Sequence, residues 1–266
     1  MVTVSASSVV LLSSSPPTRL ERYLYQEVSL QNPLSVSLFV ESARLRNDDA
    51  FFARTVRKLT IDMEKNSETY RIISLCAGLT SIVLLLRRRL NHALGEEFRE
   101  TPDLRHMRSL RHLSAMDPYI VECTHLPPSI THLSIIRTTT YLGTVPETLM
   151  ELLAGCPSIT HFMYGVGHYA NDNTDMFNLI RELKARACCP RLRMLIIVCG
   201  YYGLMHRRDA HDLAVEFECM QDMEPRIVVV NTDHEYFGVK NMLDVDLSKE
   251  DVWEAAERCM ENRSVK

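Results

Sequence analysis

Three histidines recur at one position of a short repeated pattern, which is where the sequence comes closest to a site with chemistry. His112, His132 and His161 each follow an apolar-x pair and precede an apolar residue. Strand side chains alternate between the two faces, and neighbouring strands lie ~4.8 Å apart, so the imidazoles are expected to line up on one open face. Such a column could form a metal site, a pH-sensitive patch or a row of ligand contacts. The alternative is a polar strand position that faces solvent and happens to be histidine three times. Zinc needs three or four converging ligands, and no Cys or carboxylate occupies matching positions, so we predict no metal.

Carboxylates beside the predicted strands are the second group that could act chemically. Asp117 and Glu122 follow the third strand, and Asp62 and Glu64 follow the first. Paired carboxylates support acid and base catalysis, but loop carboxylates are more often simply solvated. The stretch 171–175, Asn-Asp-Asn-Thr-Asp, lacks the glycine and the distal Glu of a calcium loop and is read as a cap or turn.

Complete catalytic and cofactor motifs are absent from the sequence. Gly165-Val166-Gly167 does not continue to G-x-G-x-x-G, and neither a phosphate-binding P-loop nor a G-x-S-x-G nucleophile elbow occurs. The eight cysteines include no C-x-x-C pair, and most adjoin apolar runs, which favours a reducing compartment. We therefore predict a protein that is not an enzyme and that uses no cofactor.

The elements that position these side chains follow from a repeat. The pattern apolar-x-x-apolar-x-apolar begins at residues 56, 79, 110, 130, 159 and 192, with a poorer copy at 226–231. A cysteine or a proline pair precedes several copies. Helical spacing or capping residues predict helices between or after the copies, and the last, which carries Trp253, is expected to cap the final repeat. These predicted helices span 67–76, 146–154, 174–187, 207–220 and 248–262.

Alternating strands and helices predict an α/β fold with parallel strands joined by crossovers. The spacing of 20 to 33 residues and the polar residues within the strands favour an irregular leucine-rich-repeat solenoid, horseshoe-like, with strands on one face and helices on the other. A doubly wound sheet is the alternative, but its strands are buried on both faces and read as apolar runs. The runs at 192–198 and 227–230 are of that kind, so the C-terminal end of the sheet is expected to be covered.

Composition agrees with a soluble globular chain. The 266 residues are 46% hydrophobic and 24% charged, with a formal net charge of -4, which gives no basic excess for nucleic acid. No apolar run reaches the ~18 residues of a membrane span. We expect a disordered leader over 1–18, one leucine-rich-repeat-like domain over 19–266, and a cytoplasmic or nuclear location.

Several segments resemble fungal, mushroom-type F-box/leucine-rich-repeat-like proteins. Residues 19–30 resemble the stretch that follows the F-box, and residues 51–61 look like the first well-marked repeat. Residues 126–133 and 156–161 are similar to later repeats, and 251–258 to the terminal helix. The resemblance implies the substrate-recognition part of a cullin-type ubiquitin ligase. No F-box is recognisable before Arg19, so a cullin-ligase adaptor is expected as a partner only where an F-box lies upstream.

The sequence therefore predicts a protein-interaction module with an unknown protein partner, and neither nucleic acid nor membrane. Its expected binding face consists of the outward strand residues Lys58, Thr60, Ser81, His112, Ser114, His132, Ser134, His161 and Met163. The alternative is a small α/β enzyme with its site on strand-end loops, at Asp117, Glu122 and His168.

Overall fold

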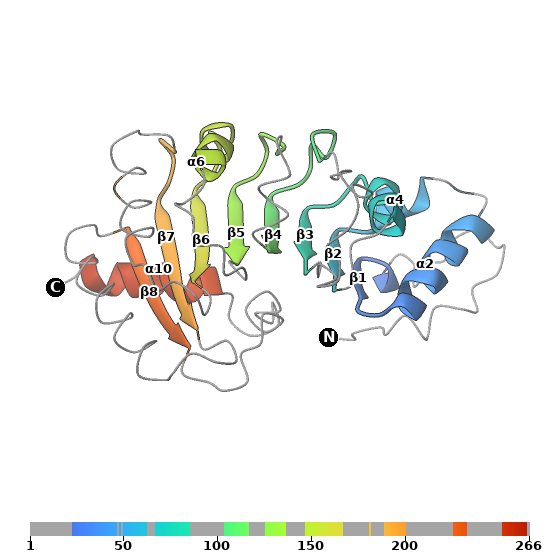
Figure 1. Cartoon of the computed structure of the whole chain (residues 1–266), viewed down its shortest axis with the longest axis horizontal. Helices are drawn as coiled ribbons and strands as arrows, with labels where there is room; N and C mark the ends of the chain where they lie inside the picture. Colours follow the sequence, from blue (N-terminus) through green and yellow to red (C-terminus); the bar gives the residue numbers. More distant parts are fainter. Residues whose placement is uncertain are drawn as a thin grey trace, which may run out of the picture. The chain divides into compact units, whose positions relative to one another are not determined.

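A computed structural model of the chain describes residues 23–46, 48, 50–62, 67–85, 104–116, 126–136, 147–166, 181, 189–200, 226–232 and 252–264. The predicted α/β class is confirmed, because eight strands form one sheet whose strand order follows the sequence (Figure 1). Contacts divide the chain into two compact units, Met1–Leu113 and Ser114–Lys266. The predicted leader over residues 1–18 lies outside the described residues.

Within its described residues, the first unit contains three strands, three helices and the start of a fourth strand. In order they are β1 (Glu27–Leu30), α2 (Pro33–Leu45), α3 (Phe51–Thr55), β2 (Lys58–Ile61), α4 (Ser67–Leu75), β3 (Ser81–Leu84) and β4 (His112–Met116), which crosses the boundary. The second unit continues with β5 (His132–Ile136), α6 (Glu147–Ala154), β6 (His161–Val166), β7 (Met194–Gly200), β8 (Ile227–Thr232) and α10 (Val252–Ser264).

Strands of the first unit pair in parallel and in register. Lys58 of β2 lies opposite Glu27 of β1 and Ser81 of β3, and Leu59 lies opposite Val28 and Ile82. Burial alternates along β2, where Leu59 and Ile61 are buried while Lys58 and Thr60 are half-buried. At β2 one face therefore packs into the core and the other carries polar side chains, while on that second face the buried Val83 of β3 lies opposite Thr60.

One hydrogen-bond arrangement recurs where successive strands begin. The carbonyl oxygen of Gln26 accepts the N–H groups of Arg57 and Lys58, at 2.9 and 3.1 Å. The carbonyls of Arg57, Thr80, Thr131 and Thr160 each accept two consecutive N–H groups of the following repeat in the same way, at 2.8–3.2 Å. The repeats aligned in the sequence are thus equivalent in backbone geometry.

A tight turn precedes the strands at the position where the sequence carries cysteine or proline. The N–H of Leu79 donates to the carbonyl of Cys76 at 3.1 Å. The same turn joins the pairs Met107–Leu110, Pro127–Ile130, Cys156–Ile159 and Cys189–Leu192, at 3.0–3.2 Å. All ten of these residues are buried, which explains why the approach to the strand favours cysteine, methionine and proline.

The thiols of these turns are expected to be inert in the folded chain. Burial raises the pKa of Cys76 from its ordinary value of 9.0 to about 12 and that of Cys156 to about 11. Because the thiolate is the reactive form, we expect alkylation at about pH 8 to be at least ~100-fold slower in the folded chain than in urea. Mass spectrometry of iodoacetamide-treated protein assigns the label to each cysteine.

The same pKa shifts predict an alkaline loss of stability. The unfolded chain releases the two thiol protons at lower pH than the folded chain does. Their contribution to stability is therefore complete below about pH 9 and is lost as the pH rises through about 11 to 12. In the alkylation experiment, rapid labelling of Cys76 and Cys156 in the native protein would contradict their burial.

The apolar anchors of the repeat form the core, as predicted. The first, fourth and sixth positions of all six well-formed copies are at most 9% exposed. These anchors are Val56, Leu59, Ile61, Leu79, Ile82, Leu84, Leu110, Leu113, Ala115, Ile130, Leu133, Ile135, Ile159, Phe162, Tyr164, Leu192, Leu195 and Ile197. Because alternate residues share one strand face, the fourth and sixth positions bury a common surface.

In the second unit the sheet is buried more deeply. β5, β6, β7 and β8 pair in parallel, with Phe162 opposite Leu133 and Leu195. Every residue from Met194 to Val198 is buried, so β7 is covered on both faces. The prediction that the C-terminal end of the sheet is covered is confirmed at this strand.

Three elements near the start, β1, α2 and α3, escaped prediction, although the signals for α2 are present in the sequence. Asn32 caps α2, its side chain accepts the N–H of Ser35 at 2.9 Å, and Pro33 follows at the first helical position.

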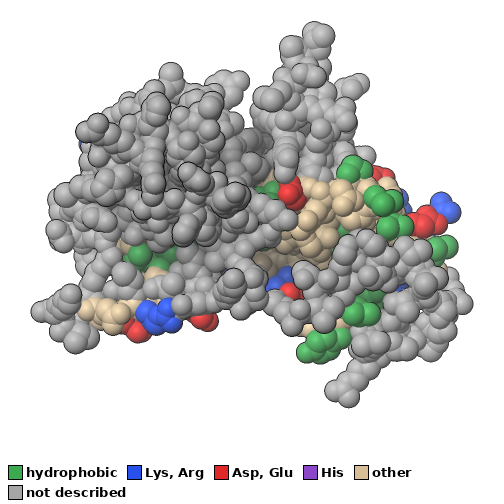
Figure 2. Space-filling view, turned by 90° about the horizontal axis from the view of Figure 1, so that it is seen from below, with side chains coloured by type: hydrophobic (Ala, Val, Ile, Leu, Met, Phe, Trp, Pro, Cys, Tyr) green, Lys and Arg blue, Asp and Glu red, His purple; other side chains and the backbone are tan. Residues whose placement is uncertain are grey.

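Hydrophobic side chains stand on the described surface in Figure 2, and the most exposed large ones are Tyr23, Leu34 and Leu45.

Of the five helices predicted from spacing or capping residues, three correspond to α4, α6 and α10. Those over 174–187 and 207–220 lie outside the described residues apart from residue 181. Among the helices in the described ranges, none has the length and apolarity that a membrane crossing requires.

Candidate functional site

Two of the three predicted histidines meet at the start of adjacent strands. His132 is the first residue of β5 and His161 the first of β6, and the strand register places them opposite each other. Their rings stack with centroids 4.3 Å apart and planes 2° from parallel. The sequence prediction of aligned imidazoles is therefore met for this pair.

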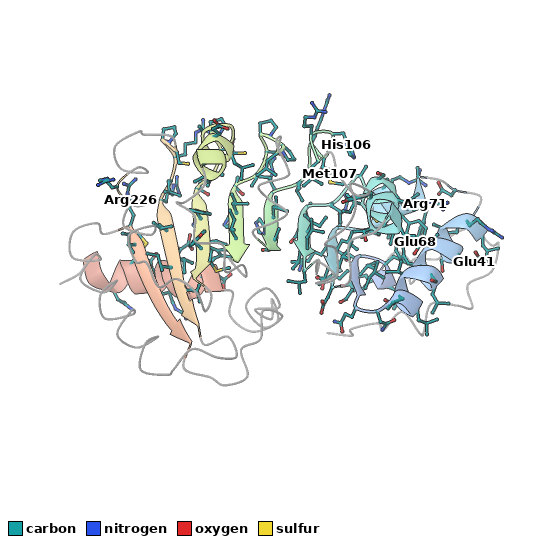
Figure 3. All side chains as sticks on the ribbon, in the orientation of Figure 1. Glu41, Glu68, Arg71, His106, Met107 and Arg226 are labelled. Atoms are coloured by element: carbon teal, nitrogen blue, oxygen red, sulfur yellow. The ribbon has the colours of Figure 1, made fainter. Side chains whose placement is uncertain are left out.

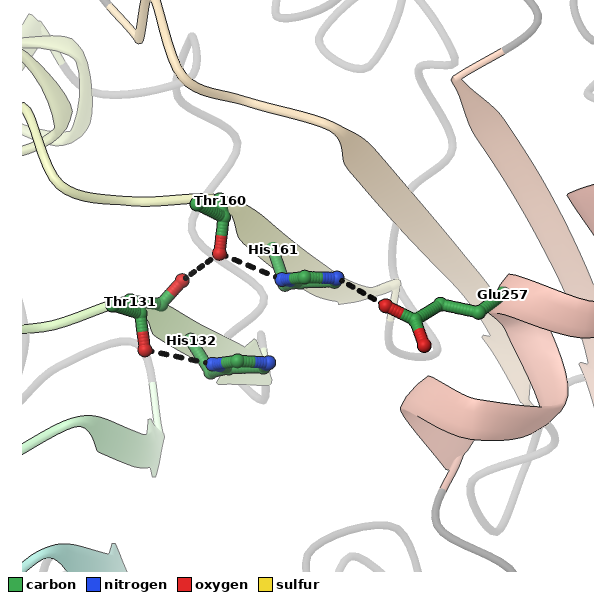
Figure 4. A network of polar contacts seen from close by, with 5 residues as sticks. All are labelled: Thr131, His132, Thr160, His161 and Glu257. Atoms are coloured by element: carbon green, nitrogen blue, oxygen red, sulfur yellow. Dashed lines mark hydrogen bonds and ion pairs between the residues drawn. The ribbon is translucent and has the colours of Figure 1, made fainter.

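A threonine before each histidine orients its ring. Thr131 Oγ1 lies 2.9 Å from His132 Nδ1, and Thr160 Oγ1 lies 2.7 Å from His161 Nδ1 (Figure 4). Thr160 Oγ1 also donates to the carbonyl oxygen of Thr131 at 3.2 Å. The shared triplet Ile-Thr-His thus builds the same local contact twice, and the two copies are joined through Thr160.

The C-terminal helix α10 closes over this pair. The ring of Trp253 meets His132 with centroids 5.2 Å apart and His161 with centroids 5.7 Å apart, edge to face in both cases. Glu257, one helical turn later, places Oε1 3.0 Å from His161 Nε2. Figure 4 shows Glu257 reaching from α10 to His161, so this helix supplies both an aromatic and an acidic contact.

The hydrogen bonds around His161 restrict which of its ring nitrogens carry a proton. If the single proton of the Thr160 hydroxyl goes to the Thr131 carbonyl, His161 Nδ1 must donate its own proton to Thr160. An ionised Glu257 only accepts, so Nε2 must donate as well. The whole chain of contacts is then satisfied by an imidazolium paired with a carboxylate, or by a neutral ring beside a protonated Glu257.

Exposure differs from the expected open face in the second unit. His161, Ser134 and Met163 are 7%, 1% and 4% exposed, so these three positions are not accessible in the folded chain. At His161 the cause is α10, because Trp253 and Glu257 of this helix contact the His161 ring. His132 and Ser114 are half-buried.

The expected face is accessible in the first unit. Lys58, Thr60 and Ser81 are half-buried, and Lys58 Nζ lies 2.7 Å from Glu27 Oε1 of the neighbouring strand. Ser29 lies opposite Thr60 in the register, which extends the polar surface by one row. We call the residues Glu27, Ser29, Lys58, Thr60 and Ser81 the polar strand face.

His112 is the third predicted histidine and belongs to the strand before the stacked pair. It is the first residue of β4, half-buried, and its N–H donates to the carbonyl of Thr80 at 3.0 Å. Within the described ranges, no cluster of three or more His, Cys, Asp or Glu side chains is arranged to hold a metal ion. The candidate loop residues Asp117, Glu122, Glu64 and His168 lie outside the described residues, while Asp62 is buried after β2.

Sequence reasoning missed the role of α10 at the histidines. It assigned Trp253 to a cap over the final repeat and gave Glu257 no role. The available signal was the lone tryptophan of the chain with a carboxylate four residues later, a spacing that places both on one helix face. What the sequence could not give is the strand face on which that helix packs.

Known proteins offer no further guide to this site. The chain matches no protein-family model, and the search of curated proteins returned no match.

Proposed function

We propose that the chain is a protein-interaction module of the irregular leucine-rich-repeat type, without catalytic activity. The observation that carries this proposal is the recurrence of one backbone geometry at successive parallel strands, with polar side chains at equivalent outward positions. Repeats of this kind present extended surfaces that bind other proteins.

The polar strand face is the surface that we assign to the partner. It combines the Lys58–Glu27 ion pair with the hydroxyls of Ser29, Thr60 and Ser81, all on a hydrogen-bonded scaffold. Residues fixed on strands lose little further freedom on binding, which favours recognition of a partner with polar groups. The mixture of charges fits a polar protein surface rather than a phosphate backbone.

In the proposed cellular role, the repeats hold a substrate for a cullin-type ubiquitin ligase, as the family resemblance implies. The ligase adaptor would bind an F-box, and the repeats would bind the target. The two contacts are separable by experiment, because only the second uses the polar strand face.

The test compares two triple variants of the full chain. We expect K58A/T60A/S81A to lose at least tenfold of its partner capture in quantitative affinity purification with chemical cross-linking. The matched control, E68A/R71A/S74A, changes three exposed residues on α4, two of which are labelled in Figure 3, and should retain the same partners. Undiminished partner capture by the first variant would refute this face as the interface. Capture of the ligase adaptor tests only the proposed ligase role.

A further inference from the structure

His161 is a buried titratable side chain that lies between a carboxylate and a second imidazole. It is 7% exposed, its Nε2 lies 3.0 Å from Glu257 Oε1, and its ring stacks on that of His132 with centroids 4.3 Å apart. A positive charge on His161 is therefore attracted by Glu257 and repelled by a charge on His132. The protonation of this ring is thus coupled to the contact between α10 and the sheet.

The hydroxyl of Thr160 allows His161 to gain a proton without losing a hydrogen bond (Figure 4). When the ring is neutral, with its proton on Nε2, the hydroxyl donates to Nδ1 at 2.7 Å. When both nitrogens carry protons, the hydroxyl accepts from Nδ1 and donates to the carbonyl of Thr131, 3.2 Å away. Nε2 donates to Glu257 in both states. The added proton therefore turns the hydrogen bond between a neutral ring and a carboxylate into an ion pair.

Other groups around the ring come from each element that packs against it. On β5 the stacked His132 disfavours a second positive charge, so the two rings take up protons one after the other. On β7 the apolar Met194 lies opposite His161 in the register, and Arg193 before it is exposed. The other described charged side chains of α10 are exposed, and they are Glu254, Arg258 and Glu261. Among these described groups, Glu257 is the one at hydrogen-bond distance from His161.

We propose that the His161–Glu257 pair is a proton-dependent clasp, which holds α10 more tightly against β5 and β6 when His161 is charged. The ion pair exists only while α10 is docked, because Glu257 belongs to that helix. Its contribution to docking is therefore present at mildly acidic pH and is lost as the pH rises and the ring becomes neutral. The clasp lies in the second unit and does not depend on partner binding at the polar strand face.

Hydrogen exchange of the full chain at about pH 6 and about pH 8.5, read by mass spectrometry, tests the clasp. Imidazoles change charge in this range, whereas exposed carboxylates stay ionised. The measured quantity is the protection factor of residues 252–264, corrected for the intrinsic pH dependence of exchange and compared with that of residues 58–61. We expect the relative protection of α10 to be at least ~threefold higher at the lower pH, an effect between those of exposed and buried ion pairs.

Glu257→Gln is the decisive variant, because a glutamine oxygen still accepts from Nε2 but carries no charge. We expect α10 to stay docked in E257Q and the ratio of protection between the two pH values to fall to about one. The matched control, Glu254→Gln, removes the same charge from an exposed position of α10 and should keep the wild-type pH dependence. His132→Asn removes the second imidazole and should also keep it, because the proton is assigned to His161.

The inference is overturned if the protection of α10 in the wild-type chain is equal at the two pH values or greater at the higher one. It is also overturned if E257Q keeps the pH dependence or H132N loses it, because the proton would then act elsewhere. The comparison within the wild-type chain needs no substitution, so the test remains valid where a variant does not fold.

Discussion

Replacing Gly78 with alanine is expected to lower the free energy of unfolding by about 3 kcal/mol, the upper end of the usual cost of overpacking. A Cβ at this position would overlap the backbone carbonyl oxygen of Ala53 in α3 and lie 3.1 Å from Arg57 Nη1. Arg57 also donates to the carbonyls of Gly78 and Arg54, at 2.8 and 3.0 Å. Neither the Ala53 carbonyl nor the Arg57 side chain can move away without breaking contacts that hold α3 against the turn before β3.

Gly155 provides the matched control for this substitution. A Cβ there would meet the carbonyls of Glu151 and Leu152 at 3.4 Å, an ordinary contact distance. G155A should therefore change the unfolding free energy by less than about 1 kcal/mol. Urea titrations followed by circular dichroism, with hydrogen exchange over residues 51–61 and 79–85, measure both variants. Equal effects of the two alanines would show that the turn at Gly78 is not closely packed.

Replacing Phe162 with alanine is expected to cost about 3–5 kcal/mol. Phe162 is fully buried in β6, on the strand face opposite to His161, where it lies between Leu133 and Leu195 in the register. The centroid of its ring also lies 6.2 Å from the centroid of the Tyr164 ring. Removing it leaves a cavity that the hydrogen-bonded neighbouring strands cannot close, because their backbones are fixed by the ladder.

The matched variant is Phe162→Leu, which keeps most of the volume and should cost roughly 1–2 kcal/mol. Trp253, the only tryptophan, lies in the same unit, so its emission reports unfolding there directly. Urea midpoints from that emission give both values. A loss below ~1 kcal/mol for F162A would mean that the fourth position of this repeat is not a core anchor.

Much of the fold follows from the period of the apolar residues. Anchors at the first, fourth and sixth positions predicted which side chains are buried, and the capped helical segments predicted α4, α6 and α10. β1 was missed as a strand although Tyr25, Val28 and Leu30 have the same apolar spacing as the recognised copies. The signal for this first copy was therefore present, and Tyr25 and Leu30 are buried like the anchors of the later copies.

The candidate site was predicted in part. The stacking of His132 and His161 follows from a shared register, which the repeat alignment supplied. The burial of His161 did not follow, because it depends on a helix that arrives 96 residues later. Amphipathic spacing tells which side of α10 is apolar but not which strand face receives it.

These differences divide the predicted binding face into two kinds of surface. Lys58, Thr60 and Ser81 are accessible, whereas Ser134, His161 and Met163 are buried in their own unit. We propose that the accessible part binds a partner directly, whereas the histidine part packs against α10.

Site-specific photo-cross-linking tests directly whether the polar strand face binds a partner protein. A benzoylphenylalanine replaces Thr60 on the polar strand face in one full-length variant and Arg71 on α4 in the other. We expect cross-linked partner protein from position 60 and none above background from position 71. Cross-links from position 71 alone, or equal yields from both positions, would contradict it.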